Sequence, residues 1–241
     1  MRGTAEGAGV ELAYESRGDG AAVLLVHGLA TTAAPLLAEV GELPGARVVG
    51  YDRRGYGASG APEPFGGTTV EEQGEDAASL LRALGLGPVV VAGDGFGGLV
   101  ALDLLHRHRP LVAAAVLRDP PFFAFVPEAT EVLAEAQGRV REAVHLGGPA
   151  AGVEAWTGER PAPEAVRGFY ADVAGLASLS LGRRELRAFD VPVALVSSPG
   201  APRHVRRAAD ELAALLPDVR RSADGDLAAA LRDALGRHPP R

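Results

Sequence analysis

The segment VVVAGDGFGGLVALDLL, which begins at Val89, limits the possible folds more than any other part of the sequence. It contains a run of β-branched residues, a turn rich in glycine and an apolar helical pattern. Short apolar runs of this kind are typical of strands that are buried on both faces of a sheet. Glycine suits the sharp backbone reversal between them. The segment therefore predicts a buried strand, a tight turn with Gly95 at its tip, and a helix.

Strand-like runs and helical patterns alternate along most of the chain. Further strands are predicted at residues 10–16, 22–27, 47–51, 113–117, 193–197 and 218–222, and helices at residues 70–84, 99–108, 203–215 and 226–235. The GDG of residues 18–20 predicts a hairpin between the first two strands. The alternation predicts an α/β fold with a mostly parallel central sheet and helices on both faces. Such sheets bind ligands beyond the carboxyl ends of their strands.

Residues 122–188 interrupt the alternation, because they contain no strand pattern. Helices are predicted at residues 128–146 and 163–181, on either side of the glycine- and proline-rich GGPAAG segment. We therefore expect a helical lid at residues 122–188. It is inserted between a first part of the core at residues 1–121 and a last part at residues 189–241.

Composition excludes several classes of function. The net charge of −7 argues against a nucleic-acid surface. The absence of cysteine excludes thiolate metal sites and a cysteine nucleophile. No apolar run has the length of a membrane span or of a signal-peptide core. We expect a cytoplasmic protein with a small-molecule ligand and with no metal, cofactor, nucleic acid or membrane as partner; the oligomeric state stays open.

Four motifs occur in series: VLLVHGLATT, YDRRGYGASG, GDGFGG and FDVPVALVSSPG. Together they resemble the α/β-hydrolase superfamily, in the lidded branch that includes enol-lactonases, C–C bond hydrolases and haloperoxidases. The resemblance covers nearly the whole chain. It implies an α/β-hydrolase fold and an oxyanion hole made by the backbone N–H groups of Leu29 and Phe96. It also implies that His27 and Gly28 shape the loop beside the substrate.

The catalytic side chains of that superfamily are missing from their usual positions. In that superfamily a serine stands at the tip of the turn, and an acid late in the chain orients a histidine. Here Gly95 occupies the serine position, and no carboxylate lies near Ala201, where the late acid belongs. Asp224 or Gly225 stands about where the histidine belongs. The sequence therefore predicts that this is not a conventional serine hydrolase.

Two carboxylates are candidates for other chemistry. Asp94 is one candidate for a catalytic carboxylate, but it precedes the turn tip, whereas relatives with an aspartate nucleophile carry it at the tip itself. The alternative to a catalytic role is that Asp94 forms a hydrogen bond to the backbone or to an arginine. Asp119 follows a strand after which some relatives place their triad acid, and it could carry a proton. For Asp119 the alternative is an ion pair with Arg118 or a cap on the following turn.

Four residues are predicted to contact the ligand besides Gly95, whose missing side chain leaves room for a ligand atom. His27 and Gly28 lie in the first motif. The alternative for His27 is a structural role in this loop. Phe122 opens the lid region, and His204 starts a helix near the missing acid. Packing between lid and core is the alternative for Phe122.

Three functions agree with these features. The first is a small-molecule enzyme that uses the oxyanion hole for proton transfer, cyclisation, decarboxylation or elimination without a covalent intermediate. The second is a catalytically inactive binding or scaffold protein. The third is a hydrolase that activates water directly through Asp119 or Asp94. Whether the chain is an enzyme stays open.

Overall fold

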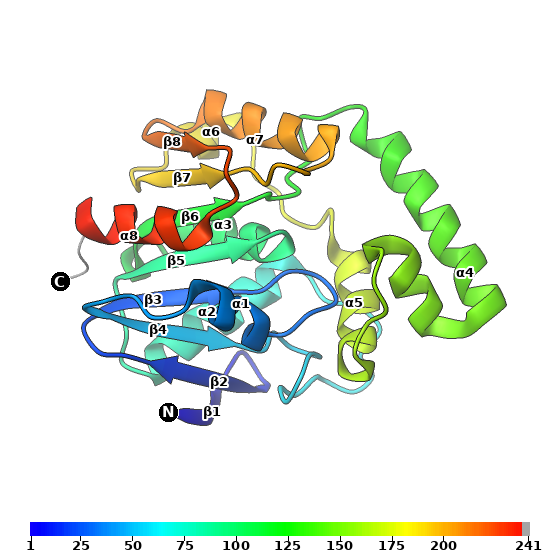
Figure 1. Ribbon diagram of the computed structural model, residues 1–241, viewed down its shortest axis with the longest axis horizontal. Helices are drawn as coiled ribbons and strands as arrows, with labels where there is room; N and C mark the ends of the chain where they lie inside the picture. Colours follow the sequence, from blue (N-terminus) through cyan, green and yellow to red (C-terminus); the bar gives the residue numbers. More distant parts are fainter. Residues whose placement is uncertain (238–241) are drawn as a thin grey trace.

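The computed structural model describes residues 1–237 and has an eight-stranded sheet at its centre (Figure 1). The strand order is β1-β2-β4-β3-β5-β6-β7-β8. β2 is antiparallel to β1 and to β4, whereas β4, β3, β5, β6, β7 and β8 are mutually parallel. The mostly parallel sheet is confirmed. The strands are β1 Arg2–Glu6, β2 Glu11–Arg17, β3 Ala21–Val26, β4 Ala46–Tyr51, β5 Val89–Asp94, β6 Val112–Arg118, β7 Val193–Val196 and β8 Val219–Ser222.

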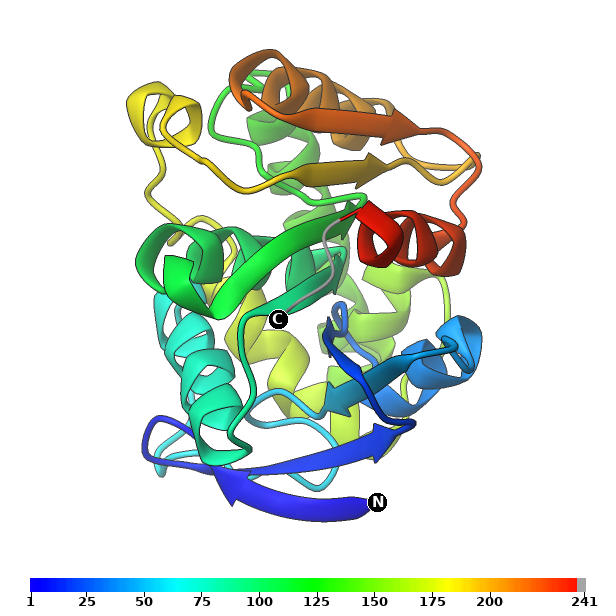
Figure 2. The same ribbon diagram turned by 90° about the vertical axis from the view of Figure 1, so that its left-hand side faces the viewer.

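Helices cover both faces of the sheet, as the turned view in Figure 2 shows. α2, α3 and α7 contribute to one hydrophobic cluster, and α1 and α8 contribute to the other. Along β3, Leu24 lies in the first cluster, and its neighbours Val23 and Leu25 lie in the second. This alternation explains why the central strands are apolar at nearly every position. The helices are α1 Ala33–Val40, α2 Val70–Ala83, α3 Phe96–Arg107, α7 Arg203–Leu215 and α8 Leu227–Arg237, with a short 3₁₀ helix at Arg109–Leu111.

The predicted hairpin at residues 18–20 is wrong. β2 and β3 do not pair, because β4 lies between them in the sheet. The two glycines of GDG allow the chain to pass close to β4 on its way from β2 to β3. A Cβ atom on Gly18 would lie 2.4 Å from the carbonyl oxygen of Ala46, and one on Gly20 would lie 2.3 Å from that of Gly45. The turn therefore passes directly over the start of β4, where only a residue without a side chain fits.

The two long helices of the predicted lid region lie beyond the carboxyl ends of the strands (Figure 1). They are α4 Ala129–Thr157 and α5 Pro163–Gly175. α4 is kinked at Gly148, where φ is 81° and ψ is −177°, and Pro149 follows. The GGPAAG segment thus breaks the helix as predicted, but the chain returns to helix at once. α5 ends before residue 181, the end predicted for it.

The last part of the predicted lid belongs with the core in space. α6, Arg183–Arg187, packs against α7. Its Leu186 is fully buried in the cluster that also contains residues of β7. Of the predicted lid region, α4 and α5 thus lie over the carboxyl ends of the strands, and residues 176–182 lead back to the core.

Candidate functional site

A sharp turn joins β5 to α3 at the carboxyl edge of the sheet. At its tip Gly95 has φ 51° and ψ −119°, and α3 begins at the next residue. The Gly95 N–H donates to the carbonyl oxygen of Arg118 at the end of β6, at 2.8 Å. The Gly98 N–H donates back to the Gly95 carbonyl oxygen at 2.9 Å. The predicted strand, turn and helix are all present.

The glycines of this turn have different physical roles. A Cβ atom on Gly97 would lie 2.1 Å from the carbonyl oxygen of Val26, and one on Gly93 would lie 2.4 Å from that of Gly97. These two positions allow α3 to pack closely on the strands. At Gly95, the Gly28 Cα at 4.0 Å is the only heavy atom within 4 Å of such a Cβ among the described residues other than 94–96. The space beside the tip of the turn is therefore open.

The loop after β3 lies against this turn. A Cβ atom on Gly28 would lie 3.2 Å from the carbonyl oxygen of Asp94. In the part of the chain that the structure describes, neither the Leu29 N–H nor the Phe96 N–H donates to a protein acceptor. Phe96 is also the first residue of α3, where an N–H has no partner within the helix. The protein therefore uses neither of the two predicted oxyanion donors within residues 1–237.

His27 does not present a ring nitrogen to a ligand. The side chain is fully buried, Nδ1 lies 2.9 Å from the Gly28 carbonyl oxygen, and the Arg53 N–H donates to Nε2 at 2.9 Å. Burial lowers the pKa of His27 well below its ordinary value, and the charge of Arg53 lowers it further. The imidazole is thus neutral, with the proton on Nδ1 donated to Gly28. His27 braces the loop, which is the structural alternative to ligand contact.

Asp94 is paired with an arginine. Arg118 donates from Nε to Asp94 Oδ1 at 2.7 Å and from Nη2 to Glu39 Oε2 at 3.0 Å. Burial lowers the pKa of Arg118, but the hydrogen bonds to Glu39 and Asp94 outweigh this effect and leave that pKa raised. The arrangement agrees with the alternative of an arginine partner for Asp94.

Asp119 lies directly after β6, next to the turn. Both carboxylate oxygens accept from the Ser198 N–H, at 3.2 and 3.3 Å. The ion pair considered between Asp119 and Arg118 is wrong, because Arg118 is bound to Asp94 and Glu39. The backbone of Asp119 has φ 46°, a region in which aspartate is one of the few tolerated side chains. The half-buried carboxylate therefore lies where the ends of β6 and β7 meet.

Gly225, one of the two residues predicted to stand about where the resembled family has its histidine, lies beside the same strand ends. A Cβ atom on Gly225 would lie 3.4 Å from the Ser198 Cα and 3.6 Å from its Oγ. Ser198 is the residue whose N–H binds Asp119. An imidazole is absent from this place, since residue 225 is a glycine.

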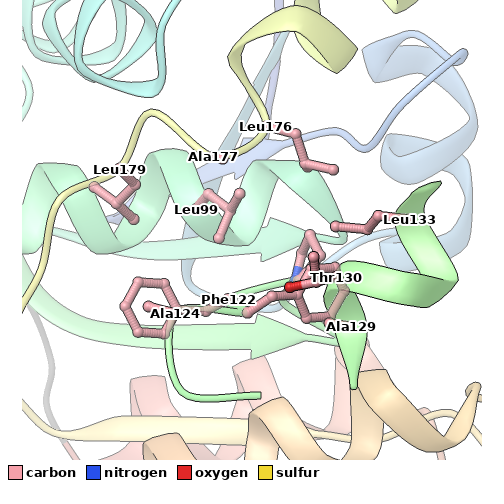
Figure 3. A pocket seen from close by; sticks show the side chains of 11 residues that line it. Leu99, Phe122, Ala124, Ala129, Thr130, Leu133, Leu176, Ala177 and Leu179 are labelled. Atoms are coloured by element: carbon pink, nitrogen blue, oxygen red, sulfur yellow. The ribbon is translucent and has the colours of Figure 1, made fainter. Parts of the chain in front are cut away.

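An apolar cavity of about 210 Å³ lies between α3, the start of α4 and the segment after α5 (Figure 3). Phe122 lines it, and Leu99 contributes to it from α3, one helical turn after Gly95. None of the lining residues is charged, and Thr130 is the only one with a hydroxyl group. The lining residues are Leu99, Pro121, Phe122, Phe123, Ala124, Ala129, Thr130, Leu133, Leu176, Ala177 and Leu179.

His204 is not among the residues that line this cavity. Its ring packs on Phe123, with the ring centroids 5.4 Å apart. Burial lowers the pKa of His204, and the charge of Glu128 opposes this. The predicted ligand contact of His204 is therefore replaced by packing behind a cavity-lining phenylalanine.

The largest buried polar network of the site was not predicted from the sequence. Arg53 forms an ion pair with Asp172 of α5 at 2.7 Å, and both side chains are fully buried. Gln73 and Tyr56 complete the network, because each donates to a different oxygen of Asp172, at 2.6 and 2.7 Å. The only sequence signal was the position of Asp172, three residues after the buried Phe169 on the same face of a helical pattern.

Asp52 stands directly before Arg53 and Arg54 but binds neither of them. It accepts from the backbone N–H groups of Ala33 and Ala58, at 3.0 and 3.1 Å. Arg54 binds Asp76 of α2, with Nε to Oδ2 at 2.6 Å. The two arginines thus bind separate buried carboxylates, Asp172 and Asp76.

Metal and membrane features are absent from residues 1–237. No group of three His, Cys, Asp or Glu side chains in this range could hold a metal ion. No helix in the same range has the length and apolarity needed to cross a membrane.

Comparison with solved structures places the whole chain on one known fold. A thermophilic esterase from Thermogutta terrifontis has a TM-score of 0.77 and 24% identity, with 98% of each chain covered. A meta-cleavage product hydrolase from Pseudomonas fluorescens has a TM-score of 0.68 and 15% identity, with 98% of this chain and 97% of the other covered. At such identities the likeness shows the fold.

Sequence relatives are hydrolases. The chain is 34% identical over 119 residues to the uncharacterized hydrolase YraK of Bacillus subtilis, and 30% identical over 125 residues to bifunctional epoxide hydrolase 2 of Sus scrofa. The alignments cover 49% of this chain, but 44% and 22% of these relatives, so the chain spans less than half the length of either. The family model for the alpha/beta hydrolase fold matches residues 21–172. The chain belongs to the alpha/beta hydrolase family.

Proposed function

We propose that the protein binds a small, mainly apolar molecule with a carbonyl oxygen and catalyses a reaction without a covalent intermediate. Proton transfer is the simplest such reaction; cyclisation, decarboxylation and elimination need the same groups. The observation that carries the proposal is the open space at Gly95, beside two backbone N–H groups without protein acceptors. A ligand oxygen there would accept from Leu29 and Phe96, in the way that an oxyanion hole stabilises developing charge.

The apolar cavity supports an uncharged ligand body. An engineered cavity of about 150 Å³ lined by apolar side chains binds benzene, so a cavity of 210 Å³ has room for a ring with a short chain. Pro121 lines the cavity two residues after Asp119, and Leu99 lines it one turn after Gly95. A ligand body in the cavity would thus lie near both the turn and the carboxylate.

Asp119 is the residue that we assign to proton transfer. It is half-buried and is not paired with an arginine. Within residues 1–237, the backbone N–H of Ser198 is the only hydrogen-bond donor to its carboxylate. With a ketone, its carboxylate would take a proton from the carbon next to the carbonyl and return it from the same side. The enolate oxygen formed in between would rest on the two N–H groups.

Two other functions are retained because each has its own support. A scaffold or binding protein without catalysis needs only the ligand site. A hydrolase that activates water through Asp119, or less favourably through the arginine-bound Asp94, agrees with the hydrolase relatives. Neither depends on a serine, since residue 95 is a glycine.

Isotope exchange with benzylacetone tests the proposal. Wild-type protein in deuterium oxide should speed the exchange of the protons next to the carbonyl over the rate in buffer, as measured by NMR. Asp119→Asn should lose this rate but keep ligand binding. Binding without exchange would favour the scaffold, and an absence of saturable binding would exclude the ligand site altogether.

A cavity-filling variant locates the ligand. Ala177→Leu adds a branched side chain inside the lining and should weaken benzylacetone binding at least tenfold by calorimetry. Ala134→Leu, on the exposed side of α4 and outside the lining, is the matched control and should bind like wild type. Equal binding by both variants would mean that the ligand lies elsewhere.

A further inference from the structure

The guanidinium of Arg53 joins the loop after β3 to the lid. Its Nε donates to the His27 carbonyl oxygen at 2.9 Å, and Nη2 donates to the Gly28 carbonyl oxygen at 2.7 Å. On the other side, Nη1 donates to Gln73 Oε1 at 2.6 Å, and Nη2 lies 2.7 Å from Asp172 Oδ2. One fully buried side chain thus contacts the substrate-facing loop, α2 and α5 at the same time.

The bond to Gly28 has a direct geometric consequence for Leu29. The Gly28 carbonyl and the Leu29 N–H belong to one peptide unit, which is planar and trans, so the two groups point in opposite directions. The Gly28 oxygen is held by Arg53 Nη2 and also lies 2.9 Å from His27 Nδ1. When this oxygen is held toward Arg53, the Leu29 N–H must point the opposite way.

Asp172 makes this arrangement depend on the lid. The Asp172 carboxylate forms the buried ion pair with Arg53, and Asp172 belongs to α5. Without Asp172, the guanidinium would be a buried cation with no ion-pair partner among residues 1–237, a state that costs several kcal/mol and favours rearrangement. Displacement of α5 would therefore release Arg53 and leave the Gly28 carbonyl oxygen with His27 Nδ1 as its one remaining donor among residues 1–237.

We infer that Arg53 is a positioning residue that sets the direction of the Leu29 N–H, and that Asp172 couples this direction to the seating of lid helix α5. The oxygen-binding half of the site is therefore complete only when α5 is in place. The inference rests on the proposed function in one respect, namely that a ligand oxygen accepts from Leu29.

The neighbouring arginine provides a matched control. Arg54 is also buried and ion-paired, with Asp76 of α2, and it donates from Nη2 to the Ala8 carbonyl oxygen at 3.2 Å. Asp76 in turn accepts from the Ala8 N–H at 2.8 Å. This second pair therefore resembles the first in chemistry and burial, but it ties α2 to the β1–β2 turn and does not touch the loop at Gly28.

Two double variants separate these roles. Arg53→Met with Asp172→Asn removes both charges together, and methionine can fill the space between the Tyr56 and Phe96 rings that flank the guanidinium. Arg54→Met with Asp76→Asn is the same change at the control pair. Each is compared with wild type for binding of benzylacetone and of butylbenzene, which has the same number of carbon atoms and no oxygen.

The ratio of the two affinities measures the hydrogen bonds to the ligand oxygen. Wild type should bind benzylacetone about 25-fold more tightly than butylbenzene, because each of the two net hydrogen bonds contributes roughly a factor of five. The Arg53/Asp172 variant should reduce this ratio to less than about a third of the wild-type value, with butylbenzene affinity unchanged. The Arg54/Asp76 variant should keep it. An unchanged ratio in the Arg53/Asp172 variant would overturn the inference.

A second measurement needs no ligand. The backbone amide NMR signal of Leu29 should shift or broaden in the Arg53/Asp172 variant and stay in place in the Arg54/Asp76 variant. If wild type does not prefer the ketone, oxygen binding in the proposed function fails, and the NMR comparison still tests the positioning. An undisturbed Leu29 signal in a folded Arg53/Asp172 variant would refute the positioning itself.

Discussion

Replacement of Gly95 by serine tests the open tip of the turn. Apart from residues 94–96, a serine Cβ would have only the Gly28 Cα within 4 Å among the described residues, at 4.0 Å, which is ordinary contact. The cost of the change therefore comes from the backbone. A side chain at φ 51° and ψ −119° lies in a sparsely populated region, which costs on the order of 1–3 kcal/mol.

Gly97→Ser is the contrasting change in the same turn. Its Cβ would lie 2.1 Å from the Val26 carbonyl oxygen and 2.8 Å from that of His27, so backbone atoms of α3 and of the β3 end would have to separate. Overpacking costs about 1–3 kcal/mol where side chains can move, and it costs more where only the backbone can. Gly97→Ser should thus destabilise the protein well beyond Gly95→Ser.

Thermal unfolding measures the difference. For a chain of this length, each kcal/mol shifts Tm by roughly 2–4 °C, so Gly95→Ser should lower Tm by about 2–12 °C. Gly97→Ser should lower it further or prevent folding. A loss above about 5 kcal/mol for Gly95→Ser would show that the space at the tip is filled and would refute the steric reasoning.

The same Gly95→Ser variant tests whether a catalytic base is present. Its hydroxyl would stand at the nucleophile position of the family, but a serine needs an adjacent base to react. His27 has both ring nitrogens bound, and residue 225 is a glycine. A fluorophosphonate probe should therefore label neither the variant nor wild type. Labelling of the variant would mean that a base reaches residue 95.

Two further predictions concern charge. The pKa of His27 is lowered in the folded state, so below pH 6.5 the unfolded state binds one proton more than the folded state does. The free energy of unfolding should therefore fall as the pH decreases below 6.5, by up to about 1.4 kcal/mol per pH unit from this residue. His27→Gln, whose amide can replace both hydrogen bonds, should flatten this slope in urea titrations between pH 6.5 and 5; parallel curves would contradict the assignment. Asp94→Asn should cost no more than about 1 kcal/mol, because the ion pair with Arg118 is partly exposed and Glu39 remains; a loss above about 3 kcal/mol would show a deeper structural role.

The sheet and its helices could be predicted because their signals are local. Buried parallel strands are apolar at nearly every position, and this pattern identified β3 to β7. The short β1 and α1 lack such a pattern and were not predicted. The hairpin at residues 18–20 failed for another reason: a glycine turn marks where the chain reverses, but it does not say whether a third strand enters between the two.

The site was predictable only where backbone geometry determines it. The turn at Gly95 and the loop at Gly28 follow from motifs in which glycine is required, and both have the expected form. Partners of charged side chains were less predictable. Arg118 binds Asp94 rather than its neighbour Asp119, because Asp94 is its partner in the register of β5 and β6 and so lies directly beside it.

Arg53 and Asp172 are far apart in the sequence, so their buried ion pair can be identified only from the three-dimensional structure. A buried ion pair is often no more stabilising than an apolar pair of the same volume, because desolvation of the two charges offsets their attraction. Stability alone therefore does not account for a fully buried arginine here. An apolar residue at position 53 could pack between the same aromatic rings, but it could not donate to the carbonyl oxygens of His27 and Gly28. What the charge supplies is a fixed orientation of the peptide that carries the Leu29 N–H, and this favours a site whose backbone donors are in use.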